Sequence, residues 1–431
     1  MIGSNTIKLT SASILTTFVI LMLFTLSFEA LSADKSKVFW KDWQVNGFGT
    51  LGYINSDRYS DRVPRRGVYQ NGQRIHKNGF LMDSRFGMQV KGDITDHWSV
   101  VGQMVLREQF DDEFDSYVDI AFLKYQTTNG WQLGLGRQAF DLFFLSDHRN
   151  TGYSYEWVRP PTQFYGFMPY ESFDGLKISK GWGDFDNDWH WSLSYGRVSS
   201  KFQSETYVED DEIESIGAKP AISTELTWLT GQWRLRASLA HFKVEQDVEF
   251  EEEFGEYVSE IVPFWEDFGR IVADFSQSNS FYYGSLGAAW ESDDWKVQAE
   301  WNRVKTDYIG FSGDRAYLSV SKRFGEYQPF VYSSFASDSQ EVRYKRPAPW
   351  LGPEFSDFYH HVEGFVQVSR HNERGIGVGV RWDFAPQKSL KLQLDRYFFD
   401  AKSGSVYGRV DEDYSRAEDN SWLSIAFDWV F

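Results

Sequence analysis

Charged side chains occur in two settings where their types and spacing suggest a shared role. Three arginines, Arg85, Arg107 and Arg381, alternate with apolar residues along extended segments. A second group has both signs and lies in or beside the aromatic segment 138–172: Arg137, Asp147, Arg149, Glu156 and Arg159. Facing acids and bases across water set up a field that orients polar solutes and excludes apolar ones. We therefore predict that these residues line or narrow an aqueous passage, although simple ion pairs that neutralise one another would give the same pattern.

Catalytic chemistry has less support in the sequence. Of the eight histidines, His97 falls in a predicted turn, and His148 and His360 fall in predicted loops without an evident serine partner. No Gly-x-Ser-x-Gly motif is present. An enzyme of the barrel type would need a nucleophile, a base and an orienting group near one another. We therefore predict that the protein is not an enzyme.

Metal and cofactor binding also lack a recognisable ligand pattern. His360 and His361 are adjacent, and neighbouring residues of an extended chain point to opposite sides. The acidic runs 209–212 and 249–256 lack the ligand spacing and glycine of a calcium loop, so we interpret them as solvated loops. The chain has no cysteine, which excludes disulfides and thiolate sites. We assign no metal and no cofactor.

Extended segments that alternate apolar with small or polar residues repeat along the chain and must position these charges. In segment 80–92, for example, Phe86, Met88 and Val90 alternate with Arg85 and Gln89. Period-two alternation indicates strands with one apolar face. Sixteen such strands are predicted, with fourteen or eighteen left open, at 43–53, 80–92, 98–109, 117–125, 131–137, 173–180, 189–198, 222–229, 233–244, 281–290, 295–304, 315–324, 327–335, 375–384, 389–399 and 421–431.

Connections between these strands alternate in length. Short turns rich in Gly, Asn, Asp or Pro, such as 127–130 and 385–388, alternate with long segments at 54–79, 138–172, 199–221, 245–280, 336–374 and 400–420. An antiparallel barrel in a bacterial outer membrane has short periplasmic turns and long external loops. A soluble sandwich would divide this many strands between two domains, and no linker divides the chain. We predict an all-β fold, a transmembrane antiparallel barrel over 34–431.

Both ends of the sequence and its composition agree with this compartment. Residues 14–28 form an uncharged apolar run followed by Ala30-Leu-Ser-Ala33, which predicts a cleaved signal peptide over 1–33; a membrane anchor is less well supported because a helix needs roughly 20 apolar residues to span a bilayer. Aromatic residues make up 18% of the chain, and tryptophans recur at predicted strand starts, as in an interfacial belt. The net charge of −18 argues against a nucleic-acid partner.

The segment 138–172 is too apolar to float in water. Phe143, Phe144, Trp157 and Tyr165 would be buried if it folded into the barrel, with its charges reaching the passage. A sixteen-stranded barrel leaves room for such a loop. We predict an inward-folded third external loop that constricts the lumen; the alternative is a loop that caps the rim.

The chain resembles the sixteen-stranded porins of Gram-negative outer membranes. The resemblance covers essentially all of the mature chain and is carried by Val45-Asn-Gly-Phe-Gly-Thr-Leu51, the loop after Leu135-Gly-Arg137, Ser172-Phe-Asp-Gly175 and the aromatic Phe431. The usual acidic constriction motif with paired glycines is absent, and Trp157-Val-Arg-Pro-Pro161 stands there instead. This departure leaves the ion preference open.

The resemblance implies a channel for passive diffusion of small hydrophilic solutes, usually a homotrimer, in contact with outer-membrane lipid and lipopolysaccharide. It also implies that Phe427, Trp429 and Phe431 form a signal for the barrel-assembly machinery. Two alternatives remain. One is a porin selective for acidic or sugar oligomers, with Tyr153, Tyr155 and Trp157 as a stacking track; the other, weaker alternative is an outer-membrane barrel enzyme.

Overall fold

The described part of the chain forms a barrel with long connections at one end. The computed structural model describes residues 43–57, 62–63, 66–67, 70, 78–109, 114–184, 186–202, 214–245, 261–276, 279–306, 312–338, 344–401, 403, 408–409 and 418–431. The predicted signal peptide and both acidic runs, 209–212 and 249–256, lie outside these residues.

Sixteen antiparallel strands close into a ring, as the alternation predicts. The continuous sheet also includes the two-residue strand β3 (Asn78–Gly79), and β2 (Arg62–Val63) pairs with β18 (Gly408–Arg409). The ring consists of β1 (Trp43–Ser56), β4 (Arg85–Asp93), β5 (Trp98–Arg107), β6 (Val118–Gln126), β7 (Trp131–Ala139), β8 (Ser172–Gly183), β9 (Asn187–Phe202), β10 (Glu214–Thr230), β11 (Trp233–Glu245), β12 (Asn279–Glu291), β13 (Trp295–Thr306), β14 (Gly313–Lys322), β15 (Tyr327–Asp338), β16 (Asn372–Ala385), β17 (Lys388–Phe399) and β19 (Glu418–Val430).

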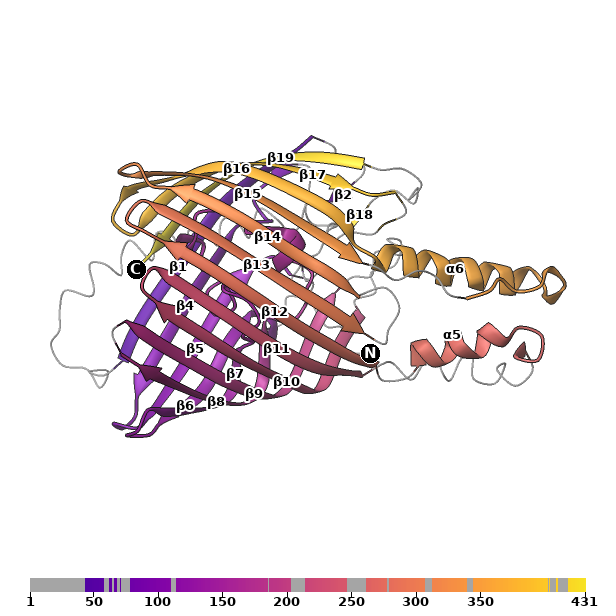
Figure 1. The fold of residues 1–431 in the computed structure, drawn as a ribbon, viewed down its shortest axis with the longest axis horizontal. Coiled ribbons are helices and arrows are strands. Elements are labelled where there is room, and N and C mark those ends of the chain that lie inside the picture. The colour runs from indigo at the N-terminus through magenta and orange to yellow at the C-terminus, as the bar shows by residue number, and fades with distance from the viewer. Residues whose placement is uncertain are drawn as a thin grey trace, which may run out of the picture. The chain divides into compact units, whose positions relative to one another are not determined.

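Some boundaries differ from the prediction. β4 begins at Arg85, because residues 81–83 form a turn in which Met82 is buried. β10 begins at Glu214, where we predicted Ile222, because its first residues pair with the long β9. The short turns gather at the left end of the barrel in Figure 1 and the long connections at the right. The predicted alternation of connection lengths is therefore present.

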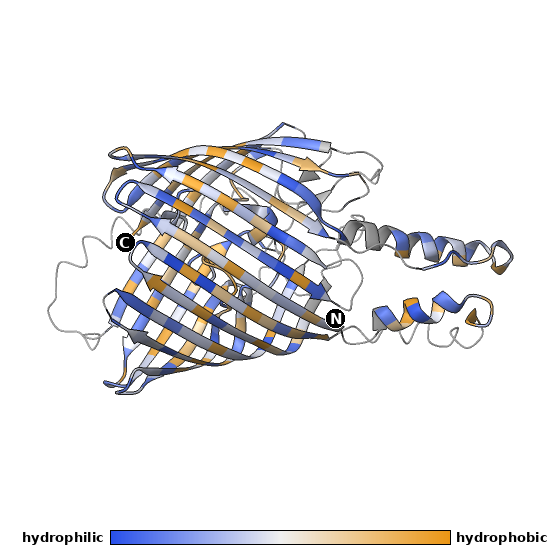
Figure 2. Cartoon of the chain, viewed as in Figure 1, coloured by the Kyte–Doolittle hydropathy of each residue, from blue (hydrophilic) through white to orange (hydrophobic). Residues whose placement is uncertain are grey.

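Side chains alternate between the two faces of the wall. In β19, Leu423 and Ile425 are 44% and 42% exposed, whereas Ser424 and Asp428 are 0% and 1% exposed. Figure 2 shows this alternation as hydrophobic and hydrophilic residues in turn along the strands. An apolar outer face with a polar inner face is the pattern of a barrel in a lipid bilayer.

The first and last long strands close the ring. β1 pairs with β19 in the register Gly49↔Trp429, and Gly47 and Phe431 exchange two main-chain hydrogen bonds of 2.9 Å. A Cβ atom at Gly47 would lie 2.1 Å from the Phe431 ring, and one at Gly49 would lie 2.1 Å from the Trp429 ring. These two glycines leave the space that the aromatic rings occupy.

Two long connections carry helices that the sequence analysis did not predict. α5 (Glu266–Ser276) lies between β11 and β12, and η3 (Pro349–Leu351) and α6 (Pro353–Ser369) lie between β15 and β16. Trp265 and Phe268 pack against Phe355 and Phe358, with ring centroids 5.5–6.4 Å apart. We call this assembly the helix pair. A short helix, α2 (Phe114–Tyr117), precedes β6, and no helix in the described ranges is long and apolar enough to cross a bilayer.

Candidate functional site

The connection between β7 and β8, residues 140–171, lies inside the barrel, and we call it the inner loop. Phe140, Phe143, Trp157 and Phe164 are 0% exposed and pack with aromatic residues of the wall. The loop contains η2 (Gly152–Ser154) and α3 (Thr162–Tyr165). Apolar side chains of this number would be costly in water, which is the reason the loop folds inward.

The first part of the inner loop is fixed to β8, β11 and β12. The main-chain oxygen of Leu142 accepts hydrogen bonds from Ser238 Oγ at 2.8 Å and Ser285 Oγ at 3.0 Å. The Lys177 ammonium pairs with the Asp141 carboxylate. Short polar side chains of the wall therefore satisfy the backbone of a buried loop.

A buried carboxylate on β13 holds the middle of the loop. Glu300 Oε2 accepts a hydrogen bond from the Phe144 main-chain nitrogen at 2.9 Å. Its Oε1 accepts bonds from the hydroxyl groups of Tyr165 and Tyr317, the latter at 2.7 Å. Farther along the loop, Lys296 Nζ lies 2.9 Å from Glu156 Oε2.

Cations of the wall hold the loop at main-chain oxygens. Arg85 Nε donates to the oxygen of Asn150 at 2.5 Å, and Arg381 Nη1 donates to that of Tyr153 at 2.7 Å. Lys391 Nζ donates to two further loop carbonyl groups at 2.7 and 2.9 Å. Arg85 and Arg381 are 1% and 7% exposed. Both side chains thus point inward, but they are covered by the loop and do not face open water.

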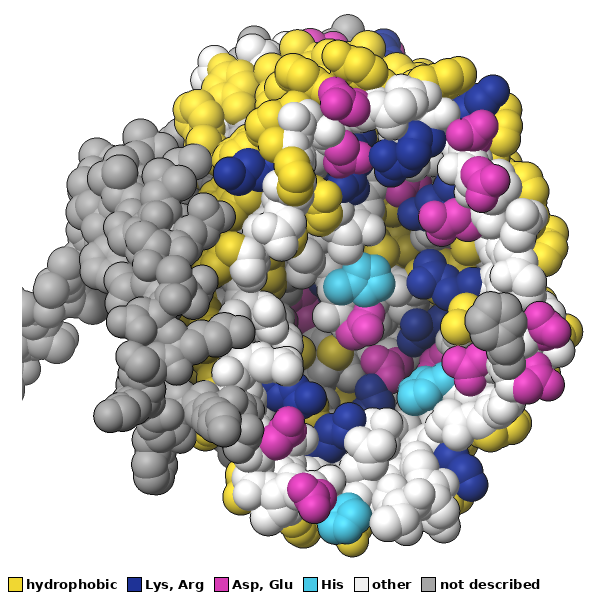
Figure 3. Space-filling model, turned by 90° about the vertical axis from the view of Figure 1, so that its left-hand side faces the viewer, with side chains coloured by type: hydrophobic (Ala, Val, Ile, Leu, Met, Phe, Trp, Pro, Cys, Tyr) yellow, Lys and Arg dark blue, Asp and Glu magenta, His cyan; other side chains and the backbone are white. Residues whose placement is uncertain are grey.

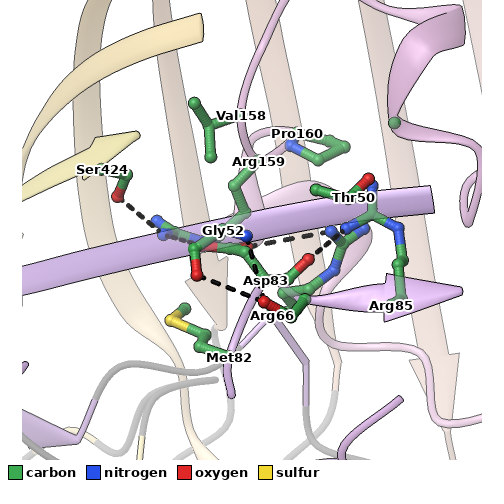
Figure 4. A network of polar contacts seen from close by, with 12 residues as sticks. Thr50, Gly52, Arg66, Met82, Asp83, Arg85, Val158, Arg159, Pro160 and Ser424 are labelled. Carbon is green, nitrogen blue, oxygen red and sulfur yellow. Dashed lines mark hydrogen bonds and ion pairs between the residues drawn. The ribbon is translucent and has the colours of Figure 1, made fainter. Parts of the chain in front are cut away.

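Arg159 joins the last part of the inner loop to residues from the beginning and the end of the chain. Its guanidinium lies 2.9 Å from Asp83 Oδ2 and 3.2 Å from Asp395 Oδ2, and it donates to Ser424 Oγ at 3.0 Å. Figure 4 shows Arg159 pointing between Asp83 and Ser424. Burial would lower the pKa of Arg159, but the Asp83 and Asp395 charges outweigh it and raise the pKa. The charge of this guanidinium is permanent; it balances one of the two buried carboxylates, and Arg66, 3.8 Å from Asp83 Oδ1, supplies a second positive charge.

A different part of the loop faces water. The side chain of Asp147 is 71% exposed, and its Oδ1 lies 2.5 Å from His148 Nδ1. Nearby, Glu171 pairs with Arg107 of β5 and lies 3.2 Å from Arg149 Nη1. Burial would raise the pKa of Glu171, but Arg107 and Arg149 outweigh it and lower the pKa to about 2.

The structure places Arg137 outside the lumen, in contrast to the prediction. It follows Leu133 and Leu135 on the outer side of β7, and Leu135 is 62% exposed. The Arg137 side chain pairs with Asp174 of β8, with Nε 2.9 Å from Oδ1. Strict alternation along the strand would have shown this, because Arg137 is two residues from Leu135.

Other groups at this site were not singled out from the sequence. Asn150 and Glu171 lie in a segment without strand periodicity, so no sequence pattern marks them. Gln393 is one of many polar residues on the strands, and only the structure shows that it accepts a hydrogen bond from Val158 N at 2.7 Å. Figure 3, viewed from the short-turn end, shows acidic, basic and histidine side chains around a recessed opening. Within the described ranges, no three His, Asp or Glu side chains come together as metal ligands would.

Comparison with known proteins identifies the fold. No protein-family model and no curated protein sequence matches the chain. OmpF of Salmonella typhi, solved with daunomycin, aligns with a TM-score of 0.50 and 10% identity over 90% of this chain and 97% of its own. An anion-selective porin from Comamonas acidovorans (TM-score 0.49, 14% identity, 90% and 99% covered) and the outer-membrane channel DcaP of Acinetobacter baumannii (0.48, 11%, 90% and 97%) also align.

The similarity to OmpF shows the fold alone. The chain is a closed antiparallel barrel of the outer-membrane porin type. Its sixteen strands match the porin-like fold that the sequence analysis predicted.

Proposed function

We propose that the protein is a channel of the Gram-negative outer membrane through which small hydrophilic solutes and ions diffuse passively. The observation that carries this proposal is the closed ring with an apolar outer face and a polar inner face, into which the inner loop folds. A wall of sixteen strands encloses more space than its own side chains fill. The inner loop occupies part of that space, so we assign it the role of the constriction.

The same proposal includes the surroundings of the protein. The short turns face the periplasm, the helix pair faces outward, and the apolar band contacts lipid and lipopolysaccharide. The proposal also includes export after cleavage of residues 1–33 and assembly as a homotrimer. It further includes insertion by the barrel-assembly machinery, with Phe427, Trp429 and Phe431 as the signal. The similarity of the fold to porins supports them only through the architecture they share.

No observation favours the alternative of a sugar-binding track. Trp157 and Tyr155 are 0% and 1% exposed, and Trp157 Nε1 donates to Ser319 Oγ at 3.1 Å. Their rings are therefore covered by the wall and are not presented to a passing sugar. Of the three residues, Tyr153 alone is partly exposed.

A planar lipid bilayer tests the channel. Purified protein should insert in discrete steps of ionic conductance, and a liposome-swelling panel of sugars, amino acids and organic acids should then rank solutes by size and charge. Correctly folded protein that leaves the bilayer silent at all voltages would refute the proposal. Heat-modifiable migration in detergent gels verifies the fold in the same sample.

A further inference from the structure

Two adjoining spaces mark one side of the inner loop. At the long-loop end, a vestibule of about 180 Å³ is lined by Arg107, Asp119 and Glu171 and also by Arg137 and Asp174 of the outer side, so it lies over the rim of the wall. Next to it, a neck of about 10 Å³ is lined by Gln103, Asp119, Glu171 and the loop residues 146–151. The two spaces share Asp119 and Glu171, so they adjoin each other at these two side chains. A volume of this size holds about one water molecule.

Elsewhere the loop is sealed against the wall. Ser238 and Ser285, which bind the Leu142 carbonyl group, are 2% and 6% exposed, and Ser319, which binds Trp157, is 1% exposed. The loop is therefore in direct contact with β11, β12 and β14 at these three points. At the neck, in contrast, the loop presents the exposed carboxylate of Asp147.

Polar contacts cross the neck from wall to loop. Arg107 Nη1 donates to Asn150 Oδ1 at 2.8 Å, and Asn150 Nδ2 donates to Asp119 Oδ1 at 3.4 Å. Arg107 also pairs with Glu171, which Arg149 of the loop contacts from the other side. Asn150 is therefore the hinge point of these contacts, since it meets both β5 and β6.

We propose that ions and small solutes cross the barrel between loop residues 146–151 and strands β5 and β6, and that the Arg107–Asn150–Asp119 contacts are a latch that closes this path. The inference rests on the proposed channel function and names the route and its gate. In the closed arrangement the neck admits water alone. Release of Asn150 joins the vestibule to the recess at the short-turn end.

Cysteine accessibility tests the route, because the chain has no cysteine of its own. Thr151→Cys places a thiol at the neck, and Ser238→Cys places one on the sealed side of the same loop. A sulfonated methanethiosulfonate should label Thr151→Cys in the folded protein. If the neck is the narrowest point, this label should lower the conductance by about twofold or more. Ser238→Cys should stay unlabelled in the folded protein.

Either reversed result overturns the route: labelling and block at Ser238→Cys, or an unchanged current after complete labelling of Thr151→Cys. Labelling is read by mass spectrometry and does not depend on current. A silent bilayer with selective labelling of Thr151→Cys would therefore refute the channel while the solvent route stands.

Removal of the latch tests the gate. Asn150→Ala should raise the single-channel conductance or the open fraction by roughly twofold or more, because the contacts that close the neck are lost. Asn302→Ala, on β13 and 0% exposed, makes the same chemical change away from the neck and should leave conductance unaltered. Equal conductance of Asn150→Ala and the unmodified protein would overturn the latch.

Discussion

At the scale of single residues, the buried charged side chains at this site mainly hold the inner loop in place and contribute less to an electric field across the lumen. The sequence analysis selected Arg85, Arg159 and Arg381 as residues that face a passage. The inward direction of Arg85 and Arg381 follows from strand alternation, whereas Arg159 was placed there with the inward-folded segment 138–172. It could not show that Arg85 and Arg381 are covered by the inner loop and donate hydrogen bonds to it, or that Arg159 of the loop binds Asp83. A pattern of types along one strand does not reveal a partner more than 200 residues away, as Asp395 is for Arg159.

Arg159 provides the clearest prediction at this scale. Arg159→Met should lower the free energy of unfolding by roughly 3–5 kcal/mol, because it removes the counter-charge of the buried Asp395 carboxylate and the nearer of the two cations of Asp83. Urea unfolding in detergent, followed by tryptophan fluorescence, measures the change. The matched control is Arg303→Met, whose ion pair with Asp314 is exposed and should contribute less than about 1 kcal/mol. Equal losses for the two variants would contradict the assignment.

Glu171 gives the site a pH dependence. Its pKa is lowered to about 2 in the folded protein, so its contribution to stability is complete above the ordinary glutamate value of roughly 4.3 and is lost as the pH falls toward 2. The charged groups that face it are Arg107 of β5, Arg149 of the loop, Arg66 and Asp119 of β6.

Glu171→Gln should therefore cost about 3 kcal/mol at pH 7 and progressively less between pH 4 and pH 2. Urea unfolding of both proteins across this range checks the difference. A gap between them that stays constant down to pH 2 would show that the carboxylate is not held ionised by its neighbours.

At the scale of elements, strands were predictable and helices were not. Each of the sixteen strands has its own period-two pattern and turn residues, so local sequence determines it. α5 contains apolar residues at helical spacing, including Phe268, Ile271 and Val272, but it lies in an otherwise polar connection. Its partner α6 comes from another connection, and short helices are stable mainly through such packing. The inner loop was predicted from its aromatic content, but its anchoring residues were not.

The helix pair allows a prediction that separates it from the barrel. Phe268→Ala, at a residue 1% exposed, should loosen the pair and speed proteolytic cleavage near α5 by about a hundredfold or more, since core Phe→Ala substitutions cost about 3–5 kcal/mol. Phe264→Ala, 58% exposed, is the control and should leave the cleavage rate nearly unchanged. Barrel migration in detergent gels should be the same for both. Loss of the folded barrel in Phe268→Ala would show that the two parts depend on each other.

At the scale of the whole molecule, closure depends on glycines facing aromatic rings. Gly47→Val should reduce the yield of folded barrel on refolding into detergent severalfold, because its side chain and the Phe431 ring require the same space. Gly102→Val is the matched control, since a Cβ atom there meets no atom within 4 Å. Heat-modifiable migration measures the folded fraction. Equal yields for the two variants would show that the seam tolerates another packing.

The anchoring of Arg159 also has a consequence for the order of events in time. Its guanidinium touches Asp83, just before β4, and Ser424, on β19. These two residues become neighbours when the first and last parts of the ring have met. The inner loop can therefore make all of its Arg159 contacts only at the end of folding, after the ring of strands has closed. In a refolding experiment, the signal of a probe placed beside Arg159 should therefore recover last, after the signal that measures formation of the strands.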